Sequence, residues 1–359
     1  MVETYYGGDH MILFHNDYSE GCHEKVLEAL VRTNMEQTPG YGEDEYCTSA
    51  ADKVRDCCET QALAVHFLVG GTQANLTVIT AGLRPHQGVL CADSGHINVH
   101  ETGAIEATGH KVLWLPSKDG KITAEQVQSY VDAHWTDPSY EHTVQPKMVY
   151  ISNPTEWGTL YSREELRALH DTCEKNRLYL FMDGARLGYG MAAFQLQKLS
   201  MHDLSWMCDA FTIGGTKVGA LFGEAVVISN LDLAEDFRYI MKQRGGMLAK
   251  GRLLGVQFDA LFTDNLYFEI SRHAIKMADI LLEKFKELGV EFAFTPQTNQ
   301  LFPILPKAVR EKLAENYTFI EMDWVDDDKR VCRFCTSWAT TEDNVRKLCA
   351  DLEEIYKKA

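Results

Sequence analysis

Short apolar runs recur along the first two thirds of the chain, and stretches with helical spacing separate them. In VHFLV (65–69) and KMVYIS (147–152), for example, apolar residues stand at consecutive rather than alternate positions. Such runs are typical of strands in a parallel sheet that is buried on both faces. The pattern therefore predicts an α/β fold built on a mostly parallel, seven-stranded sheet. The seven runs cover residues 65–69, 88–93, 111–116, 147–152, 179–183, 210–214 and 224–229.

The segments between these runs carry sequence signs of helix starts. Thr123 stands three residues before Gln126, and Ser162 stands three residues before Glu165. This spacing lets each pair exchange hydrogen bonds with the backbone in the first turn of a helix. We therefore expect helices to begin at both places, and further helices to begin near residues 72 and 98.

The pattern changes after residue 231. A long amphipathic helix is predicted over residues 265–289, where Gly289 ends it, and a last helix from about Thr341. Short apolar runs lie between the two helices and predict a small α+β unit. Its strands are expected at EFAF (291–294), LFPIL (301–305), YTFIEM (317–322) and RVCRFCTS (330–337).

This change of pattern also suggests how the chain is divided. We expect a large α/β domain over residues 12–248 and a smaller C-terminal α+β domain over residues 249–359. Residues 1–11 would form an N-terminal extension.

Composition and charge narrow the class of protein. The 359 residues carry a formal net charge of −17, so binding to nucleic acid or to an anionic membrane is not expected. The N-terminal stretch lacks the basic and apolar regions of a signal peptide, and no run approaches the roughly 20 apolar residues of a membrane span. Ten cysteines in so long a chain indicate a reduced, cytoplasmic protein rather than a disulfide scaffold.

Candidate functional residues stand directly after the predicted strands, where open parallel sheets bind their ligands. Gly71 and Thr72 follow the first strand, and the N–H groups at the start of the next helix suit a phosphate. A tight strand-to-helix turn explains the glycines about as well. Asp183 ends another strand and Arg186 follows it; such a carboxylate could face a ring nitrogen, or it could simply cap a helix.

Lys217 lies in AFTIGGTKVGALFG (210–223), a stretch that is otherwise apolar residues, glycines and threonines. Its stem could pack on apolar neighbours while the ammonium reaches water. Alternatively, the lysine is partly desolvated so that its neutral amine can attack a carbonyl. Together with a phosphate cradle, an acid for a ring nitrogen and His96 beside the ring, the second interpretation matches the needs of pyridoxal phosphate (PLP), which a lysine holds as a Schiff base.

His96 and His100 raise the question of a metal. They are four residues apart, so on a helix they would share a face, but the adjacent Glu101 is misplaced for the zinc motif HExxH. We predict no metal site.

Several motifs give the chain a further resemblance. It is similar to the threonine aldolases of the β-eliminating lyase group, which belong to the aspartate-aminotransferase-like (fold type I) PLP enzymes. The match spans nearly the whole chain, and DGAR followed some thirty residues later by the lysine is its most specific part. The motifs are YGED (41–44), HFLVGGTQAN (66–75), GHINVHETGAIEATGHKV (95–112), DGARL (183–187), GGTKVGALFGEA (214–225), NQLFPIL (299–305) and RFCTSWAT (333–340).

The resemblance implies a role for each matching residue. Lys217 would form the Schiff base and Asp183 would pair with the pyridine nitrogen, while His96 would stack on the ring. Arg186 and Arg333 would hold the substrate carboxylate. Other expected contacts to the cofactor come from Gly71, Thr72, Gln73, Asn153, Arg186 and Lys250, and other expected contacts to the substrate come from Asn16 and Tyr41.

The resemblance also implies a homo-oligomer, at least a dimer, with a tetramer favoured. Active sites of the family lie between subunits, so Tyr41 and Lys250 are candidates for reaching across from a partner chain.

Three departures from the family pattern bear on the substrate. Residues 15–18 read HNDY in place of RSDT, so that Asn16 replaces the serine. Residues 152–157 read SNPTEW where many aldolases have ENTH, whose histidine is a proposed base for the substrate hydroxyl. Lys250 stands two positions later than the family's arginine in GGMRQAG. The base is therefore open: His96 has a suitable pKa, and Glu156 is an outside candidate.

The expected reaction is PLP-dependent aldol cleavage of a β-hydroxy amino acid, L-threonine or L-allo-threonine, to glycine and acetaldehyde. Another PLP reaction, such as β-elimination or transamination, is an alternative because the bond that breaks depends on its alignment. The remaining alternatives are a non-catalytic relative that binds PLP and a nucleotide-dependent α/β enzyme in which Lys217 is a surface residue.

Overall fold

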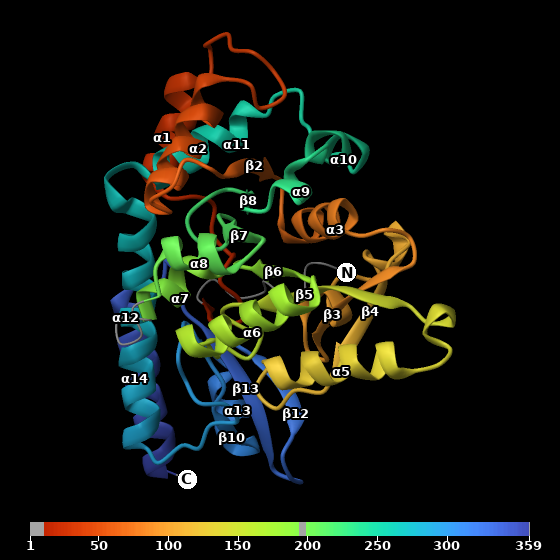
Figure 1. Cartoon of the computed structure of the whole chain (residues 1–359). Coiled ribbons are helices and arrows are strands. Elements are labelled where there is room, and N and C mark those ends of the chain that lie inside the picture. The colour runs from red at the N-terminus through yellow and green to blue at the C-terminus, as the bar shows by residue number, and fades with distance from the viewer. Residues whose placement is uncertain (1–10, 194–198, 359) are drawn as a thin grey trace.

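A seven-stranded sheet runs through the centre of the molecule (Figure 1), whose computed structural model describes residues 11–193 and 199–358. The strand order is β2-β8-β7-β6-β5-β3-β4. Only β8 is antiparallel to its neighbours, β2 and β7. The mostly parallel sheet of seven strands is thus confirmed, and each strand overlaps its predicted run. The strands are β2 (Ala64–Leu68), β3 (Gln87–Ala92), β4 (Lys111–Leu115), β5 (Gln145–Ser152), β6 (Tyr179–Asp183), β7 (Ala210–Gly214) and β8 (Glu224–Ile228).

Both faces of this sheet are buried, which explains why its strands are apolar at consecutive positions. In β5, Val149 and Ile151 belong to one apolar core, while Met148 and Tyr150 belong to the other. Helices cover each core. They are α1 (Glu24–Thr33), α2 (Glu45–Cys57), α3 (Gly71–Gly82), α4 (His96–Val99), α5 (Ala124–Thr136), α6 (Arg163–Asn176), α7 (Leu187–Ala193), α8 (Met201–Met207), α9 (Leu231–Ala234), α10 (Phe237–Gln243) and α11 (Arg252–Leu261), followed in the C-terminal part by α12 (Leu266–Glu287), α13 (Lys307–Leu313) and α14 (Glu342–Lys358).

The helix boundaries follow from local chemistry. Thr123 and Ser162 form the predicted capping boxes at the starts of α5 and α6, because each hydroxyl accepts from a backbone N–H and each backbone N–H donates to the side chain three residues on. Helix α12 ends at Glu287, and Gly289 then adopts a left-handed φ of 71°. Both capping boxes and the end of the long helix are therefore confirmed.

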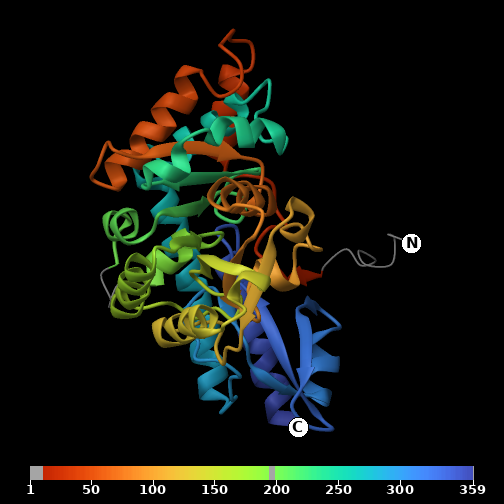
Figure 2. The same cartoon turned by 45° about the vertical axis from the view of Figure 1, so that its right-hand side comes forward.

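The C-terminal strands gather at one end of the molecule, opposite α1 and α2 (Figures 1 and 2). Strand β13 (Lys329–Cys335) is central and runs antiparallel to β10 (Ile304–Pro306), β12 (Ile320–Trp324) and β9 (Gln300–Leu301). The strand predicted at EFAF does not form. Phe292 makes only an isolated bridge to Pro303, and Phe294 instead stacks on Trp157 at 4.9 Å between ring centroids.

The division of the chain into domains at residue 248 stays a prediction. Two contacts connect the residues before this position with the residues after it. Strand β1 (Ile12–Leu13) pairs in parallel with β11 (Tyr317–Thr318). In addition, Ser49 of α2 donates to Asp259 of α11 at 2.6 Å.

In the part of the chain that the structure describes, no helix combines the length and apolar character that crossing a membrane requires.

Candidate active site

A cavity of about 350 Å³ opens at the carboxyl ends of the parallel strands. The turns after β2, β3, β5, β6 and β7 converge on it, as an open parallel sheet requires. Six of the residues expected from the sequence line the cavity: Gly71, Thr72, His96, Asp183, Arg186 and Lys217. Its wall also contains Tyr18, Ser152, Pro154, Glu156, Thr216, Phe222 and Glu224.

Asp183 is held as a buried carboxylate. Its Oδ2 accepts from the Tyr150 hydroxyl at 2.7 Å and from Asn75 Nδ2 at 2.9 Å, and its Oδ1 accepts from the backbone N–H of Ala185 at 2.9 Å. Burial alone would raise the pKa of Asp183, but the hydrogen bonds from Tyr150 and Asn75 outweigh it and lower the pKa. Asp183 therefore stays ionised, as a partner for a protonated ring nitrogen must.

His96 lies on the far side of the same hydrogen-bond network. Its Nδ1 contacts Glu101 Oε1 at 2.7 Å, and the same oxygen accepts from Asn75 Nδ2 at 2.7 Å. Burial would lower the pKa of His96, but the hydrogen bond to Glu101 and the charge of Asp183 raise it. Asn75 thus connects the carboxylates of Asp183 and Glu101, a role that the sequence analysis missed for both Asn75 and Glu101.

Lys217 stands on the turn that joins β7 to β8. The N–H groups of Gly215 and Thr216 both donate to the carbonyl of Gly223, which closes the turn. Burial, followed by the charge of Arg186, lowers the pKa of the Lys217 amine. The amine is therefore neutral more often than that of a surface lysine, which favours the nucleophilic interpretation over the solvated one.

Glu224 is a further carboxyl group in the cavity wall that the sequence analysis did not single out. It is the first residue of β8, and the whole residue is only 4% exposed. Its Oε2 is buried without a hydrogen-bond partner among the described residues. Burial and the charge of Asp183 raise the pKa of Glu224, while Lys217 opposes the rise. A neutral carboxyl beside the lysine is the result.

Arg186 is already paired on one of its two edges. Its Nε and one terminal nitrogen donate to Asp17 at 2.6 and 3.0 Å, and Asn299 donates to the same carboxylate at 3.0 Å. The side chain of Asp17 is fully buried. Burial alone would raise the pKa of Asp17, but the Arg186 charge lowers it. Because this pair uses only the side edge of the guanidinium, the end edge of Arg186 is left for a ligand carboxylate.

Arg333 lies on β13 and is not part of the cavity wall. Its terminal nitrogen donates to the carbonyl of His15 at 3.1 Å, and its Nε is buried with no acceptor in the described ranges. The amide oxygen of Asn16 accepts from the Tyr18 N–H at 2.9 Å and from Ser19. The amide oxygen of Asn16 is therefore occupied by hydrogen bonds within its own loop. Only its NH₂ group is left to donate to a ligand.

The start of α3 can hold an anion. The first N–H groups of a helix have no partner within it, and Gly70 caps α3 without a side-chain hydrogen bond. A Cβ atom placed on Gly71 would meet no atom within 4 Å, so the space beside the helix start is open. The side chain of Gln73 is not directed there, because it binds Val69 N–H and the Arg244 carbonyl, each at 3.2 Å.

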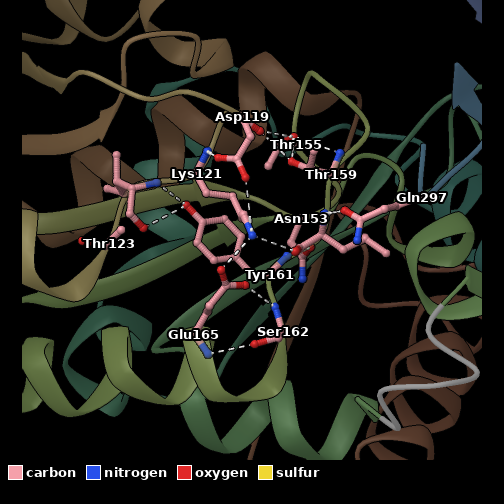
Figure 3. Close-up of polar contacts among 12 residues, drawn as sticks. Asp119, Lys121, Thr123, Asn153, Thr155, Thr159, Tyr161, Ser162, Glu165 and Gln297 are labelled. Carbon is pink, nitrogen blue, oxygen red and sulfur yellow. Dashed lines mark hydrogen bonds and ion pairs between the residues drawn. The ribbon is translucent and has the colours of Figure 1, made fainter. Parts of the chain in front are cut away.

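The loop after β5 is fastened on both sides (Figure 3). Thr155 and Thr159 join their hydroxyls at 2.7 Å, and Thr159 contacts the Asp119 carbonyl at 2.6 Å. Asn153 accepts from the Tyr161 N–H at 3.1 Å, while its Nδ2 is buried without a partner in the part of the chain described. Asn153 does not appear in the cavity wall, although Pro154 beside it does.

Six predicted residues do not line this cavity within one chain: Asn16, Tyr41, Gln73, Asn153, Lys250 and Arg333. Lys250 borders a separate surface hollow beside Asn34 and Pro39. Tyr41 borders another, and its ring packs under the Lys242 ammonium at 4.8 Å. A position away from the chain's own site is what a contribution to a partner's site requires, but it does not test that role. Across the described ranges, no three His, Cys, Asp or Glu side chains are placed to hold a metal ion.

Comparison with known proteins connects this geometry to a family. The chain matches the beta-eliminating lyase family over residues 17–307. It is 31% identical to the low specificity L-threonine aldolase of Pseudomonas aeruginosa, over 97% of this chain and 99% of that protein. A Pseudomonas relative with the same description is 32% identical over 95% of this chain and 97% of its own length.

Solved structures agree with these relatives. The threonine aldolase of Leishmania major superposes with a TM-score of 0.93 at 41% identity, covering 96% of this chain and 99% of that one. An aspartate aminotransferase of Thermus thermophilus superposes with a TM-score of 0.70 at 17% identity, covering 96% and 92%; this likeness concerns the fold alone. The matches confirm the resemblance seen in the motifs: the chain belongs to the beta-eliminating lyase family, with the fold of the fold type I PLP enzymes.

Proposed function

We propose that this chain is a lyase that cleaves the Cα–Cβ bond of a β-hydroxy amino acid, L-threonine or L-allo-threonine, to give glycine and acetaldehyde. The observation that carries the proposal is the arrangement of Lys217, Asp183 and Arg186 in the wall of one cavity. The names of the relatives supply the reaction: those compared above are threonine aldolases.

The residues present fit PLP as the cofactor. Lys217 offers an amine whose pKa is lowered, Asp183 offers an ionised carboxylate, and the open start of α3 at Gly71 and Thr72 offers N–H groups to a phosphate. Asn153, which the resemblance assigns to the cofactor, lies outside the wall of this cavity. When bound, PLP accepts the electron pair that remains on Cα after a bond to that carbon breaks.

The two arginines determine which bond that is. A carboxylate held at the end edge of Arg186 would fix the amino acid at one end, with Arg333 as the second arginine that the family resemblance assigns to it. The amine, bound to the cofactor in place of Lys217, would fix it at the other end. With both ends fixed, the remaining rotation about the bonds to Cα is lost, so that one bond is presented for cleavage. Asp17 and Asn299 position Arg186 for this task and do not contact the reacting atoms.

The first experiment is acetaldehyde release from L-threonine and L-allo-threonine by the purified protein, after its visible absorption has been recorded. The matched control is Lys217→Ala, which should fold, should lose the release and should retain no cofactor after borohydride reduction. Release from either substrate that depends on Lys217 supports the proposal. A yellow protein that releases none, but forms pyruvate and ammonia or converts its cofactor to the amine form, would assign β-elimination or transamination instead.

We also propose that the protein is a cytoplasmic homo-oligomer, at least a dimer and by family resemblance a tetramer, in which Tyr41 and Lys250 complete a partner's site. Tyr41 is 46% exposed and lies outside its own cavity. Mixing an inactive Lys217→Ala chain with an inactive Lys250→Ala chain tests this, because a shared site restores activity in the mixed oligomer. Full activity in a sedimenting monomer would contradict the proposal.

A further inference from the structure

The proposed cleavage needs a group that accepts the proton of the β-hydroxyl, and this inference rests on that proposed function. Four titratable groups other than Lys217 and Arg186 line the described cavity wall on the strand ends: His96, Glu156, Asp183 and Glu224. Three of them are engaged or closed off in ways that leave little capacity to accept a proton from a substrate.

Asp183 is the first to be set aside, since donors already surround its carboxylate and its pKa is lowered. His96 is held at Nδ1 by the buried carboxylate of Glu101, which favours its protonated form and makes it a donor. Glu224 has its unpartnered Oε2 sealed from solvent. Each of these three groups is therefore less suited than Glu156 to accept the proton of a substrate hydroxyl.

Glu156 differs from these three groups because one of its carboxylate oxygens is held in place while the other receives no hydrogen bond from another described residue. Its Oε1 accepts from the Ser152 hydroxyl at 2.8 Å, which fixes the direction of the carboxylate. No other described residue donates a hydrogen bond to its Oε2, while the half-buried side chain forms part of the cavity wall. One oxygen is thus anchored and the other is left for a ligand.

The loop that carries Glu156 is rigid enough to hold a reacting group in place. On one side of it, Thr155 is tied to Thr159 at 2.7 Å (Figure 3). On the other side, the ring of Trp157 stacks on Phe294 at 4.9 Å, with the planes 17° apart. The two neighbours of Glu156 are therefore both fixed, by a hydrogen bond and by an aromatic stack.

We propose that Glu156 is the general base for the β-hydroxyl and that Ser152 is its positioning residue. Oε2 takes the hydroxyl proton, and the O–H electron pair becomes the second bond of the aldehyde carbonyl. The Cα–Cβ bond breaks, and its electron pair stays on Cα until a proton reaches that carbon and glycine forms. Burial raises the pKa of Glu156 above its ordinary value, against the Ser152 hydrogen bond, and this moves it toward the range that suits a base at neutral pH.

Glu156→Gln tests the proposal because it keeps the shape of the side chain and removes the base. Cleavage of threonine should fall by about 10²–10⁴-fold, the usual contribution of a general base. Exchange of the Cα hydrogen of glycine in D₂O, followed by NMR, needs Lys217 but no β-hydroxyl base, so it should continue at the wild-type rate. The visible absorption of bound cofactor should also be unchanged.

Two further variants complete the design. Glu165→Gln is the matched control, since it makes the same chemical change in the first turn of α6, keeps the capping box and loses the ion pair with Lys121. It should cleave threonine at the wild-type rate. Ser152→Ala should lower kcat for cleavage while leaving glycine exchange intact, because it frees the orientation of Glu156.

The outcomes separate this inference from the proposed function. If Glu156→Gln cleaves threonine nearly as well as the wild type, or if it loses glycine exchange to the same extent as cleavage, Glu156 is not the base. If the wild-type protein exchanges the glycine hydrogen but releases acetaldehyde from neither threonine isomer, the proposed function itself fails.

Discussion

Replacing Asp17 by alanine should destabilise the protein and free Arg186 at the same time. Asp17 is fully buried and accepts three hydrogen bonds, two from Arg186 and one from Asn299. The substitution leaves the guanidinium of Arg186, itself only 13% exposed, without its counter-charge. The hydrogen bonds that orient the Arg186 guanidinium toward a substrate carboxylate are lost as well.

The size of the effect follows from this burial. Removing one partner of a buried ion pair costs about 3–5 kcal/mol, because an uncompensated charge remains in the interior. We therefore expect Asp17→Ala to lower the free energy of unfolding by about 3–5 kcal/mol. Replacing both partners removes the stranded charge, so Asp17→Ala combined with Arg186→Met should cost less than the sum of the two single changes.

Denaturant titration of all four proteins, followed by tryptophan fluorescence at equal protein concentration, measures this double-mutant cycle. A coupling of about 2–3 kcal/mol is expected, near the upper end for contacting residues. Additive single effects would refute the reasoning, since they would mean that the two side chains do not depend on each other. Asp17→Asn, which keeps the shape and removes the charge, should lie between the wild type and Asp17→Ala.

The pair also makes stability depend on pH. The pKa of Asp17 is lower in the folded protein than its ordinary value, so the unfolded chain takes up the proton first as the pH falls. The contribution is complete above the unfolded pKa of about 3.9 and is lost below it, as the pH falls through the folded pKa. Asp17→Asn should remove this part of the acid sensitivity in titrations between neutral and strongly acidic pH.

Four other substitutions test the fold and the site. Gly184→Ala would bring Cβ to 2.1 Å from the Thr212 carbonyl oxygen, so it should lower the free energy of unfolding by about 3 kcal/mol, as overpacking of a core does. Gly71→Ala should keep the melting temperature, because its Cβ would meet no atom within 4 Å. It should weaken cofactor binding, which a spectral titration measures. His96→Phe should retain much of the cleavage activity, because the ring can still stack; a loss of several orders of magnitude would make His96 the base. Ser162→Ala should cost about 1 kcal/mol in thermal unfolding, through loss of a helix cap.

Most of the sheet could be predicted because each strand carries its own signal. A strand buried on both faces is apolar at most of its positions, as β7 and β8 are, and this needs no knowledge of its neighbours. The cavity residues followed from one rule, that ligands lie after the carboxyl ends of parallel strands. Lys217, Asp183 and His96 were found in this way and do line one cavity.

The contacts that complete the site could not be predicted, because they join distant parts of the chain. Asp17 meets Arg186 across 169 residues, and nothing in the local sequence distinguishes it from a surface acid. Asn75 lies in α3 and Glu101 follows α4, and neither belongs to a local pattern that marks a site. Only the fold places them beside Asp183 and His96. The EFAF run failed as a strand for a similar reason, since an aromatic stack with Trp157 took the place of strand pairing.

The late position of β8 in the chain has a consequence for assembly. Although it is the last of the seven strands to be synthesised, it lies between β2 and β7 and joins the turn of Gly71 to the turn of Lys217. The cofactor half of the site therefore cannot close until residue 228 has joined the sheet. The substrate half closes later still, because Asp17 follows β1, the strand that pairs with residues 317–318. The residues that we propose for the cofactor and those that we propose for the substrate carboxylate are thus brought together by strand pairings that involve different lengths of the chain.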